Sequence, residues 1–197
     1  MARSSASIKC LIYCTLAYVD GKIFDMSTLH EIGSAVRVRR TEMGLTQDLL
    51  ARISGLSRST VSAVEKQSID NLSVTKAVAL LESIGLSMNV AVNSSPVPPT
   101  RKDSPSSRSA LERAAATASV SFGNAMSAKQ LEAALLGGKA PQQIRPHLQV
   151  MLDEAPVSLL AKVVDQIHTE KAIPRAQVWN QMRNLAHELK CYRLLWQ

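Results

Sequence analysis

Aromatic residues are scarce in this sequence, at 4% of its 197 residues. Proteins that bind single-stranded nucleic acid without sequence preference stack the bases on exposed aromatic rings. The scarcity of such rings therefore argues against that class of protein. Aliphatic side chains must build most of the core, and a hydrophobic content of 46% is ample for one or two domains.

Cysteine is also rare. The three cysteines are Cys10, Cys14 and Cys191, an odd number without a Cys-x-x-Cys pair. A disulfide framework needs paired cysteines and an oxidising compartment, so the composition indicates a reducing cytoplasm. No histidine lies near Cys10 and Cys14 in the sequence, which makes them a poor zinc site.

The motifs of common enzyme classes are missing. No glycine-rich phosphate loop follows an expected strand, and no Gly-x-Ser-x-Gly sequence is present. His147, His168 and His187 stand singly in expected helices, and His187 lacks the second histidine of a zinc-protease helix. We therefore expect no enzyme activity, no catalytic residues, no cofactor and no metal.

The apolar run IKCLIYCTLAYV, near the N-terminus, is too short to span a bilayer and lacks an Ala-x-Ala cleavage site. Three interpretations of residues 1–25 stay open. They are a strand or helix that packs on the next domain, a weak targeting segment, or translated sequence upstream of a true start at Met26. We expect a bacterial cytoplasmic protein that is associated with the nucleoid and not with a membrane.

The sequence carries an excess of positive charge, with a formal net charge of +7. Such a charge favours a polyanionic partner such as nucleic acid. Because the charge is spread along the chain, it is weak evidence by itself, and the argument for a partner depends on a local motif.

The most informative stretch is TQDLLARISGLSRSTVSAVEK, from Thr46 to Lys66. Thr46 is suited to cap a helix, because its hydroxyl can accept a hydrogen bond from a first-turn N–H group. Aliphatic residues follow at helical spacing. Gly55 stands where this helix must end and the chain must turn sharply.

A second short helix is expected after this turn, with Ser57 as its N-cap. Val61 and Val64 are spaced to hold it against the first helix. Its outer face carries small or hydrogen-bonding side chains and one long basic side chain, namely Ser59, Ser62, Ala63 and Arg58. A core does not require such a face, so the pattern predicts a helix that lies in the major groove of DNA.

Residues 32–66 resemble the XRE (Cro and phage-repressor) helix-turn-helix family. The matching residues are Arg37, Arg39, Arg40, Gly44-Leu45-Thr46-Gln47, Leu50-Ala51, Gly55, Ser57, Thr60-Val61-Ser62 and Glu65. The resemblance implies that Arg40 and Glu65 form a structural ion pair. It also implies that the second short helix reads DNA.

Two further helices flank the motif. Ser27 is suited to cap a helix over about 28–43, and apolar spacing predicts another helix over 73–84 that ends at Gly85.

The sequence LSMNVAV then alternates apolar and polar residues, which predicts a strand. Its apolar residues Met88, Val90 and Val92 would pair with the same strand of a second copy across a two-fold axis. This end of the domain is also similar to HipB-type antitoxins, over about residues 29–92. The alternative is that the strand folds back onto the N-terminal run 11–19.

Residues 93–109 are rich in Pro, Ser and charge and are expected to form a flexible linker. Residues 110–197 contain amphipathic helices of ordinary length, with a capping box at Ser127 and Gln130. Their apolar end, Tyr192 and Leu194-Leu195-Trp196, either anchors a partner or packs on this bundle. The expected fold is therefore mainly α: residues 26–92 form a helix-turn-helix domain with a short C-terminal dimerisation strand, followed by the linker and a small helical bundle.

The leading hypothesis is a dimeric, sequence-specific DNA-binding repressor of a palindromic operator. Arg58 is the best candidate for a bidentate bond to guanine, whereas Gln47 and Ser57 contact phosphate or brace the reading residues. The full set of candidate DNA-binding residues is Gln47, Ser57, Arg58, Ser59, Thr60, Ser62, Ala63 and Lys66.

The HipB resemblance implies the antitoxin of a toxin–antitoxin module, which represses its own operon and has a cognate toxin as a further partner. Two alternatives stay open. One is a free-standing XRE regulator whose C-terminal bundle senses a ligand or oligomerises. The other is a protein-interaction adaptor without DNA binding.

Overall fold

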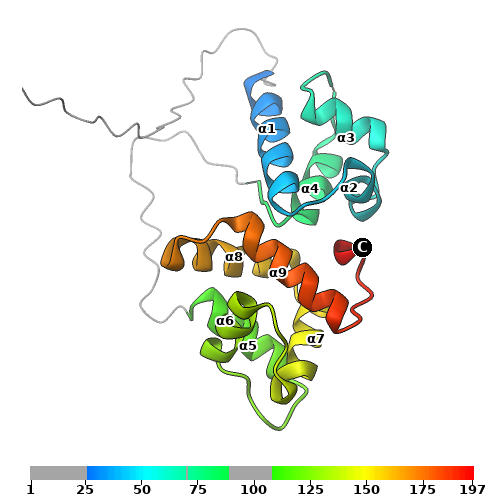
Figure 1. Cartoon of the computed structure of the whole chain (residues 1–197). Coiled ribbons are helices and arrows are strands. Elements are labelled where there is room, and N and C mark those ends of the chain that lie inside the picture. Colours follow the sequence, from blue (N-terminus) through cyan, green and yellow to red (C-terminus); the bar gives the residue numbers. More distant parts are fainter. Residues whose placement is uncertain (1–25, 70, 89–107) are drawn as a thin grey trace, which may run out of the picture.

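The computed structural model describes residues 26–69, 71–88 and 108–197. Within these ranges all regular structure is helical (Figure 1). The N-terminal segment 1–25 and most of the expected linker lie outside the described residues.

The first four helices pack into one group, in which α1 and α2 both contact α3, and α2 also contacts α4. Their bounds are α1 (Met26–Glu42), α2 (Gln47–Ser54), α3 (Arg58–Glu65) and α4 (Val74–Ser83). The expected helices are thus confirmed, with one correction: α1 already begins at Met26, so Ser27 lies inside the helix and is not its N-cap.

Local capping chemistry explains why α2 and α3 begin and end where they do. The Thr46 hydroxyl accepts a hydrogen bond from the backbone N–H of Leu49, and the Ser57 hydroxyl accepts one from the N–H of Thr60. Gly55, between the two helices, has a φ of 69°, a left-handed conformation that favours glycine. These three predictions from the sequence are confirmed.

The remaining helices form a bundle below the first group in Figure 1. They are α5 (Ala110–Ser119), α6 (Ala128–Gly137), η1 (Gln142–Ile144), α7 (Arg145–Glu154), α8 (Val157–Lys171), α9 (Arg175–Glu188) and η2 (Leu194–Trp196). The predicted capping box at Ser127 and Gln130 is present. A second capping box, formed by Ser109 and Glu112, was not predicted, because Ser109 was assigned to the linker.

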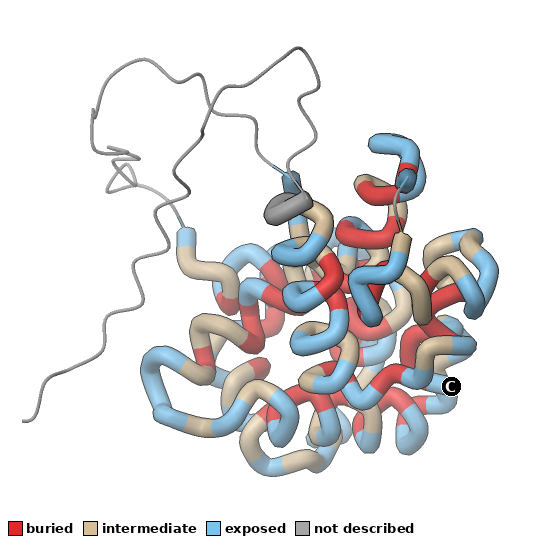
Figure 2. The backbone as a smooth tube through the Cα atoms, turned by 90° about the horizontal axis from the view of Figure 1, so that it is seen from above, coloured by how far each residue is buried: buried red, intermediate tan, exposed pale blue. Residues whose placement is uncertain are grey.

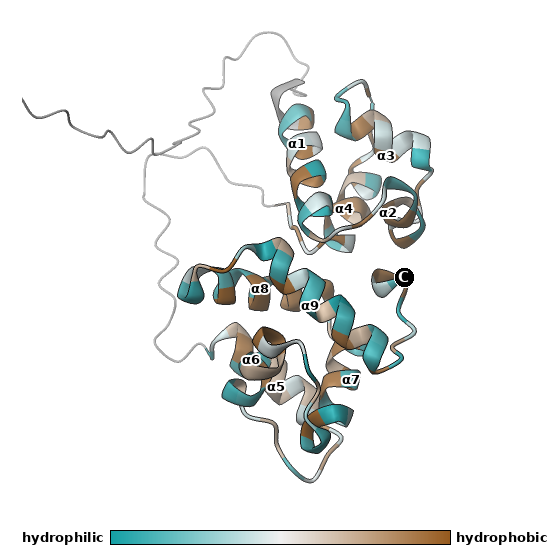
Figure 3. Ribbon diagram, in the orientation of Figure 1, coloured by the Kyte–Doolittle hydropathy of each residue, from teal (hydrophilic) through white to brown (hydrophobic). Residues whose placement is uncertain are grey.

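The buried side chains of both groups belong to one hydrophobic cluster. Figure 2 marks the buried residues in red along the backbone. Most of them are aliphatic, as the composition predicts. Figure 3 shows that hydrophobic and hydrophilic residues occupy different sides of the helices. The buried aromatic residues in the described part of the chain are Trp179 and Trp196, whose ring centroids lie 6.4 Å apart.

The predicted strand is not seen in the described residues. Leu86 to Met88 is irregular, and the Leu86 N–H donates to the Leu81 carbonyl, which makes Leu86 part of the turn that ends α4. Met88 is 42% exposed, so it offers an apolar surface but forms no strand. Val90 and Val92, the other residues of the expected dimerisation strand, lie outside the described residues.

The bundle packs directly on the first group: α9 contacts α1, α8 contacts α4, and η2 contacts α2. α3 lies at the end of the molecule away from α5, α6 and α7 (Figure 1). The apolar end LLW therefore packs between the bundle and α2, where Leu195 and Trp196 are buried. Packing on the bundle is thus observed for Leu195 and Trp196, whereas Tyr192 and Leu194 are exposed.

Candidate nucleic-acid interface

The helix α3 has one buried side and one accessible side. Val61 and Val64 are fully buried against α1 and α2. On the other side Arg58 and Ser59 are exposed. Ser62, Ala63 and Thr60 are half-buried, and Lys66, just past the helix end, is exposed. The structure thus brings the candidate reading residues together on one short helix, with Arg58 the longest side chain at its N-terminus.

Three hydroxyl groups form a cluster at the N-terminus of α3. The Ser57 Oγ lies 2.8 Å from both Ser59 Oγ and Thr60 Oγ1. Ser57 Oγ also accepts from the Thr60 N–H, so its own bonds are filled, whereas the hydroxyls of Ser59 and Thr60 can each bond to a further group. The positive end of a helix dipole lies at the same place. The cluster is therefore suited to donate a hydrogen bond to a phosphate oxygen, or to bond to a base edge, next to Arg58.

A buried ion pair fixes the other end of α3. Glu65, which is 6% exposed, accepts hydrogen bonds from Arg40 at 2.6 Å (Nε to Oε1) and 3.0 Å (Nη2 to Oε2). Arg40 also donates to the Leu45 carbonyl at 2.8 Å. Bidentate arginine–carboxylate pairs are strong and directional. Through these bonds Arg40 connects α1, the turn before α2, and the C-terminal end of α3.

Gln47 joins this network. Its Nε2 donates to Glu65 Oε2 at 2.8 Å, and the side chain is half-buried. Burial would raise the pKa of Glu65, but the hydrogen bonds from Arg40 and Gln47 outweigh that effect and hold the pKa below its ordinary value. The geometry favours bracing over phosphate contact for the amide nitrogen of Gln47.

Two residues that the sequence interpretation overlooked set the distance between α1 and α3. A Cβ added at Gly33, in the middle of α1, would lie 2.3 Å from the carbonyl oxygen of Val64. Gln67, just after α3, donates from Nε2 to Ser34 Oγ at 3.0 Å and to the His30 carbonyl at 3.3 Å. A glycine inside an otherwise good helical pattern was the available signal for this close approach.

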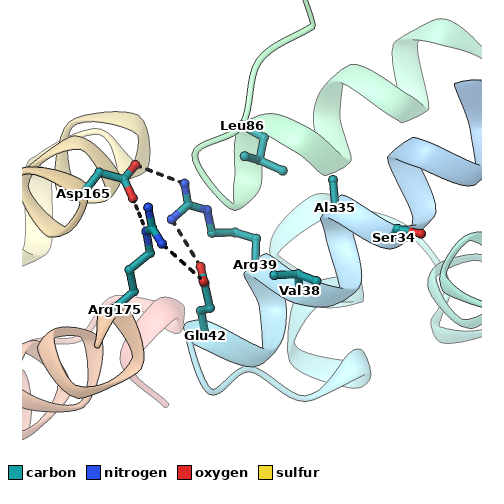
Figure 4. Close-up of a pocket in the computed structure, with 8 residues that line it drawn as sticks. All are labelled: Ser34, Ala35, Val38, Arg39, Glu42, Leu86, Asp165 and Arg175. Carbon is teal, nitrogen blue, oxygen red and sulfur yellow. Dashed lines mark hydrogen bonds and ion pairs between the residues drawn. The ribbon is translucent and has the colours of Figure 1, made fainter. Parts of the chain in front are cut away.

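A pocket of about 410 Å³ lies where α1 meets α8 and α9 (Figure 4). Its lining residues are Ser34, Ala35, Val38, Arg39, Glu42, Leu86, Asp165 and Arg175. The charged residues among them are paired with one another rather than directed at the open space. We therefore treat this region as a contact between the two groups of helices.

The cysteine that the structure describes, Cys191, is half-buried, and burial together with the Asp153 carboxylate raises its pKa to about 12. Its thiol therefore stays protonated at neutral pH and is a poor metal ligand or nucleophile. Cys10 and Cys14 lie outside the described residues. In the described part of the chain, no three His, Cys, Asp or Glu side chains gather as potential metal ligands, and no helix is long and apolar enough to cross a membrane.

Comparison with known protein families identifies one region of the chain. A family model described as helix-turn-helix (HTH_3) matches residues 36–90. No curated protein and no solved structure matches the chain. The match begins in α1, includes α2, the Gly55 turn and α3, and extends past α4.

These comparisons support the broad XRE resemblance and give no support to the HipB-like antitoxin subgroup. The buried α2 scaffold, the accessible α3 and the family match agree with one another. Residues 36–90 are a helix-turn-helix domain of the XRE type, which implies sequence-specific DNA binding.

Proposed function

We propose that the protein is a transcriptional repressor that places α3 in the major groove of a specific operator. The observation that carries this proposal is the two-sided environment of α3, whose valines are buried while Arg58 and Ser59 are exposed at its N-terminus. Recognition helices of helix-turn-helix proteins contact base edges with their N-terminal residues.

Each accessible residue has a chemistry suited to one part of the DNA. Arg58 can form two hydrogen bonds to guanine O6 and N7. The hydroxyls of Ser59 and Ser62 can bond to base edges or to phosphate, and the Ala63 methyl can contact a thymine methyl. Lys66, exposed beyond the C-terminal end of α3, is suited to a phosphate.

A homodimer on a palindromic operator is part of the proposal. Two recognition helices related by a two-fold axis read half-sites about one helical turn apart. The exposed Met88, directly after the turn that ends α4, offers an apolar contact for a second copy. Light scattering of the full chain, with and without operator DNA, measures whether two copies associate.

The same proposal divides the chain into a DNA-binding part over 26–92 and a helical part over 110–197. Direct packing of α8, α9 and η2 on the first helices favours a self-contained regulator whose bundle belongs to the DNA-binding unit. The narrower antitoxin hypothesis has no support in the comparisons. Co-purification tests it, with the protein expressed together with its neighbouring genes. The antitoxin hypothesis requires that the product of a neighbouring gene purifies with this protein in stoichiometric amount.

Selection of binding sites from random duplex DNA, followed by affinity measurement over a salt series, tests the repressor proposal. A specific binder enriches one palindromic sequence, and its affinity falls steeply with added salt, because binding releases condensed counterions and this release becomes less favourable. An adaptor without DNA binding would enrich no sequence and show no salt-dependent affinity, which would contradict the proposal.

A further inference from the structure

Two neighbouring arginines at the end of α1 face different partners. Arg40 pairs with Glu65 inside the helix-turn-helix domain, whereas Arg39 donates from Nη2 to Asp165 Oδ2 in α8 at 3.3 Å. Consecutive helical residues point about 100° apart, because an α-helix has 3.6 residues per turn. The last turn of α1 is therefore held by the recognition machinery on one side and by the bundle on the other.

The bundle side of this turn is a closed ring of alternating charges, drawn in Figure 4. Asp165 pairs with Arg39 at 3.3 Å and with Arg175 at 2.6 Å. Glu42 completes the ring, at 3.6 Å from Arg39 and 4.0 Å from Arg175. Single exposed pairs contribute little because solvent screens them, but each arginine here is shared in a network between α1, α8 and α9.

The turn that follows α1 also contacts the bundle. Arg183, in α9, donates from Nη2 to the Met43 carbonyl, and its Nη1 donates to Asn180 Oδ1 at 3.3 Å. The next residue, Gly44, has a φ of 65°, and a Cβ there would lie 2.8 Å from Arg183 Nη1. The guanidinium therefore packs on the backbone of the turn itself.

This turn leads directly into the network that braces α3. Leu45 donates from its N–H to the Arg40 carbonyl at 3.0 Å and accepts from Arg40 Nη1 at 2.8 Å. Arg40 and Gln47 in turn bond to Glu65. Hydrogen bonds, joined by the backbone of residues 43–45, thus link α9 through the turn between α1 and α2 to the C-terminal end of the recognition helix.

We infer that Arg183 is a positioning residue for DNA recognition, through which the bundle sets the placement of α2 and α3. The inference rests on the proposed function. Arg183 touches the turn and not the accessible side of α3, so it acts on specific recognition through geometry. A change in α9 alters the Met43–Leu45 turn and hence the Arg40–Glu65–Gln47 network.

The test compares Arg183→Met with the wild-type chain on the selected operator and on random duplex DNA. Loss of a coupling residue should weaken operator binding about 2- to 30-fold. Binding to random DNA and the salt slope should stay the same, because these depend on phosphate contacts. Arg183→Lys keeps one charged donor for the Met43 carbonyl and should recover part of the operator affinity.

Arg145→Met is the matched control. Arg145 pairs with Glu188 at 3.3 Å inside the bundle and is similarly accessible, but it does not contact the first four helices through that pair. It should leave operator binding unchanged. Equal operator affinity for Arg183→Met and wild type would overturn the inference, and so would a parallel loss on random DNA with a smaller salt slope, which would make Arg183 a phosphate contact.

A second readout does not depend on DNA. The side-chain amide resonances of Gln47 in the free protein should shift in Arg183→Met and stay in place in Arg145→Met, with unchanged helical content in both. If wild-type protein bound no specific DNA but these resonances shifted, the repressor proposal would fail while the structural link stood. Unchanged Gln47 resonances would contradict the link itself.

Discussion

Arg58 carries the sharpest prediction for a single residue, since it is the long basic side chain exposed at the start of α3. Arg58→Ala should weaken operator binding by about 1–3 kcal/mol and relax preference at one base pair. Affinities for a set of single-base operator variants measure both effects. Arg52→Ala, which removes an exposed arginine from α2, is the matched control and should keep the base preference. A uniform loss across all sequences would make Arg58 a phosphate contact.

Because of Glu65, the free energy of unfolding of the protein should depend on pH. Because its folded-state pKa lies below the ordinary value of 4.5, the stabilisation is complete above that value and is lost as pH falls through the lower, folded-state pKa. Glu65→Gln should cost about 3 kcal/mol at neutral pH, the lower range for breaking a buried pair. The difference in free energy of unfolding from wild type should shrink in acid, when Glu65 is itself protonated.

Denaturant unfolding at a series of pH values from 7 to about 3 measures this difference, a range that extends below the ordinary glutamate pKa. The pKa of Asp165 is also lowered, because hydrogen bonds from Arg175 and Arg39 outweigh its burial, so this carboxylate too loses its stabilising effect in acid. Asp165→Asn should therefore be studied beside Glu65→Gln. A stability difference for Glu65→Gln that stays constant down to the lowest pH would contradict the assignment.

Between elements, the contact of α1 with α3 depends on Gly33. Alanine favours a helix over glycine by about 1 kcal/mol, but the added Cβ would lie 2.3 Å from the Val64 carbonyl oxygen. Overpacking costs about 1–3 kcal/mol, so Gly33→Ala should destabilise the protein. Gly137→Ala is the control, because Gly137 is also helical and a Cβ there meets nothing within 4 Å. Chemical denaturation should therefore show that the free energy of unfolding falls in Gly33→Ala and rises in Gly137→Ala.

The ends of the helices are well predicted from the sequence. Thr46, Gly55 and Ser57 act on backbone groups within a few residues, so their roles follow from local chemistry. The predicted strand over 86–92 is described only as far as Met88, and this part is irregular, because alternation of apolar residues is only a local pattern. At Leu86 the hydrogen bond to Leu81 closes α4, and a Cβ at Gly85 would lie 2.8 Å from the Ala161 Cβ in α8. This tertiary contact leaves no periodic trace in the sequence.

The candidate site divides in the same way. The accessible face of α3 follows from its own polar residues, and the family resemblance predicts the Arg40–Glu65 pair that the structure shows. Arg183 could not be found, because its partner is a backbone carbonyl 140 positions earlier in the chain. A basic residue on an amphipathic helix is usually a solvated surface residue, and only the packing of α9 on α1 gives it another role.

Across the whole molecule, Trp196 joins the two groups of helices. Its Nε1 donates to the Leu152 carbonyl at 3.0 Å, and it is buried beside Trp179 while η2 contacts α2. Trp196→Ala should lower the free energy of unfolding by about 3–5 kcal/mol, as expected for a large core aromatic. Tyr192→Ala is the control, because Tyr192 is 83% exposed and should be nearly neutral. Equal stability of the two variants would show that η2 does not hold the halves together.

The position of η2 also affects how the protein folds during its synthesis. During synthesis α1 to α4 leave the ribosome long before Leu195 and Trp196, although these two residues cover part of α2. Until they arrive, an apolar seam on the nascent chain stays open to water and to other chains. Exposed apolar surface of this kind makes incomplete folds prone to aggregation. The packing on α2 is therefore completed only after these residues have been translated, and a chain stalled before them would keep this apolar surface exposed.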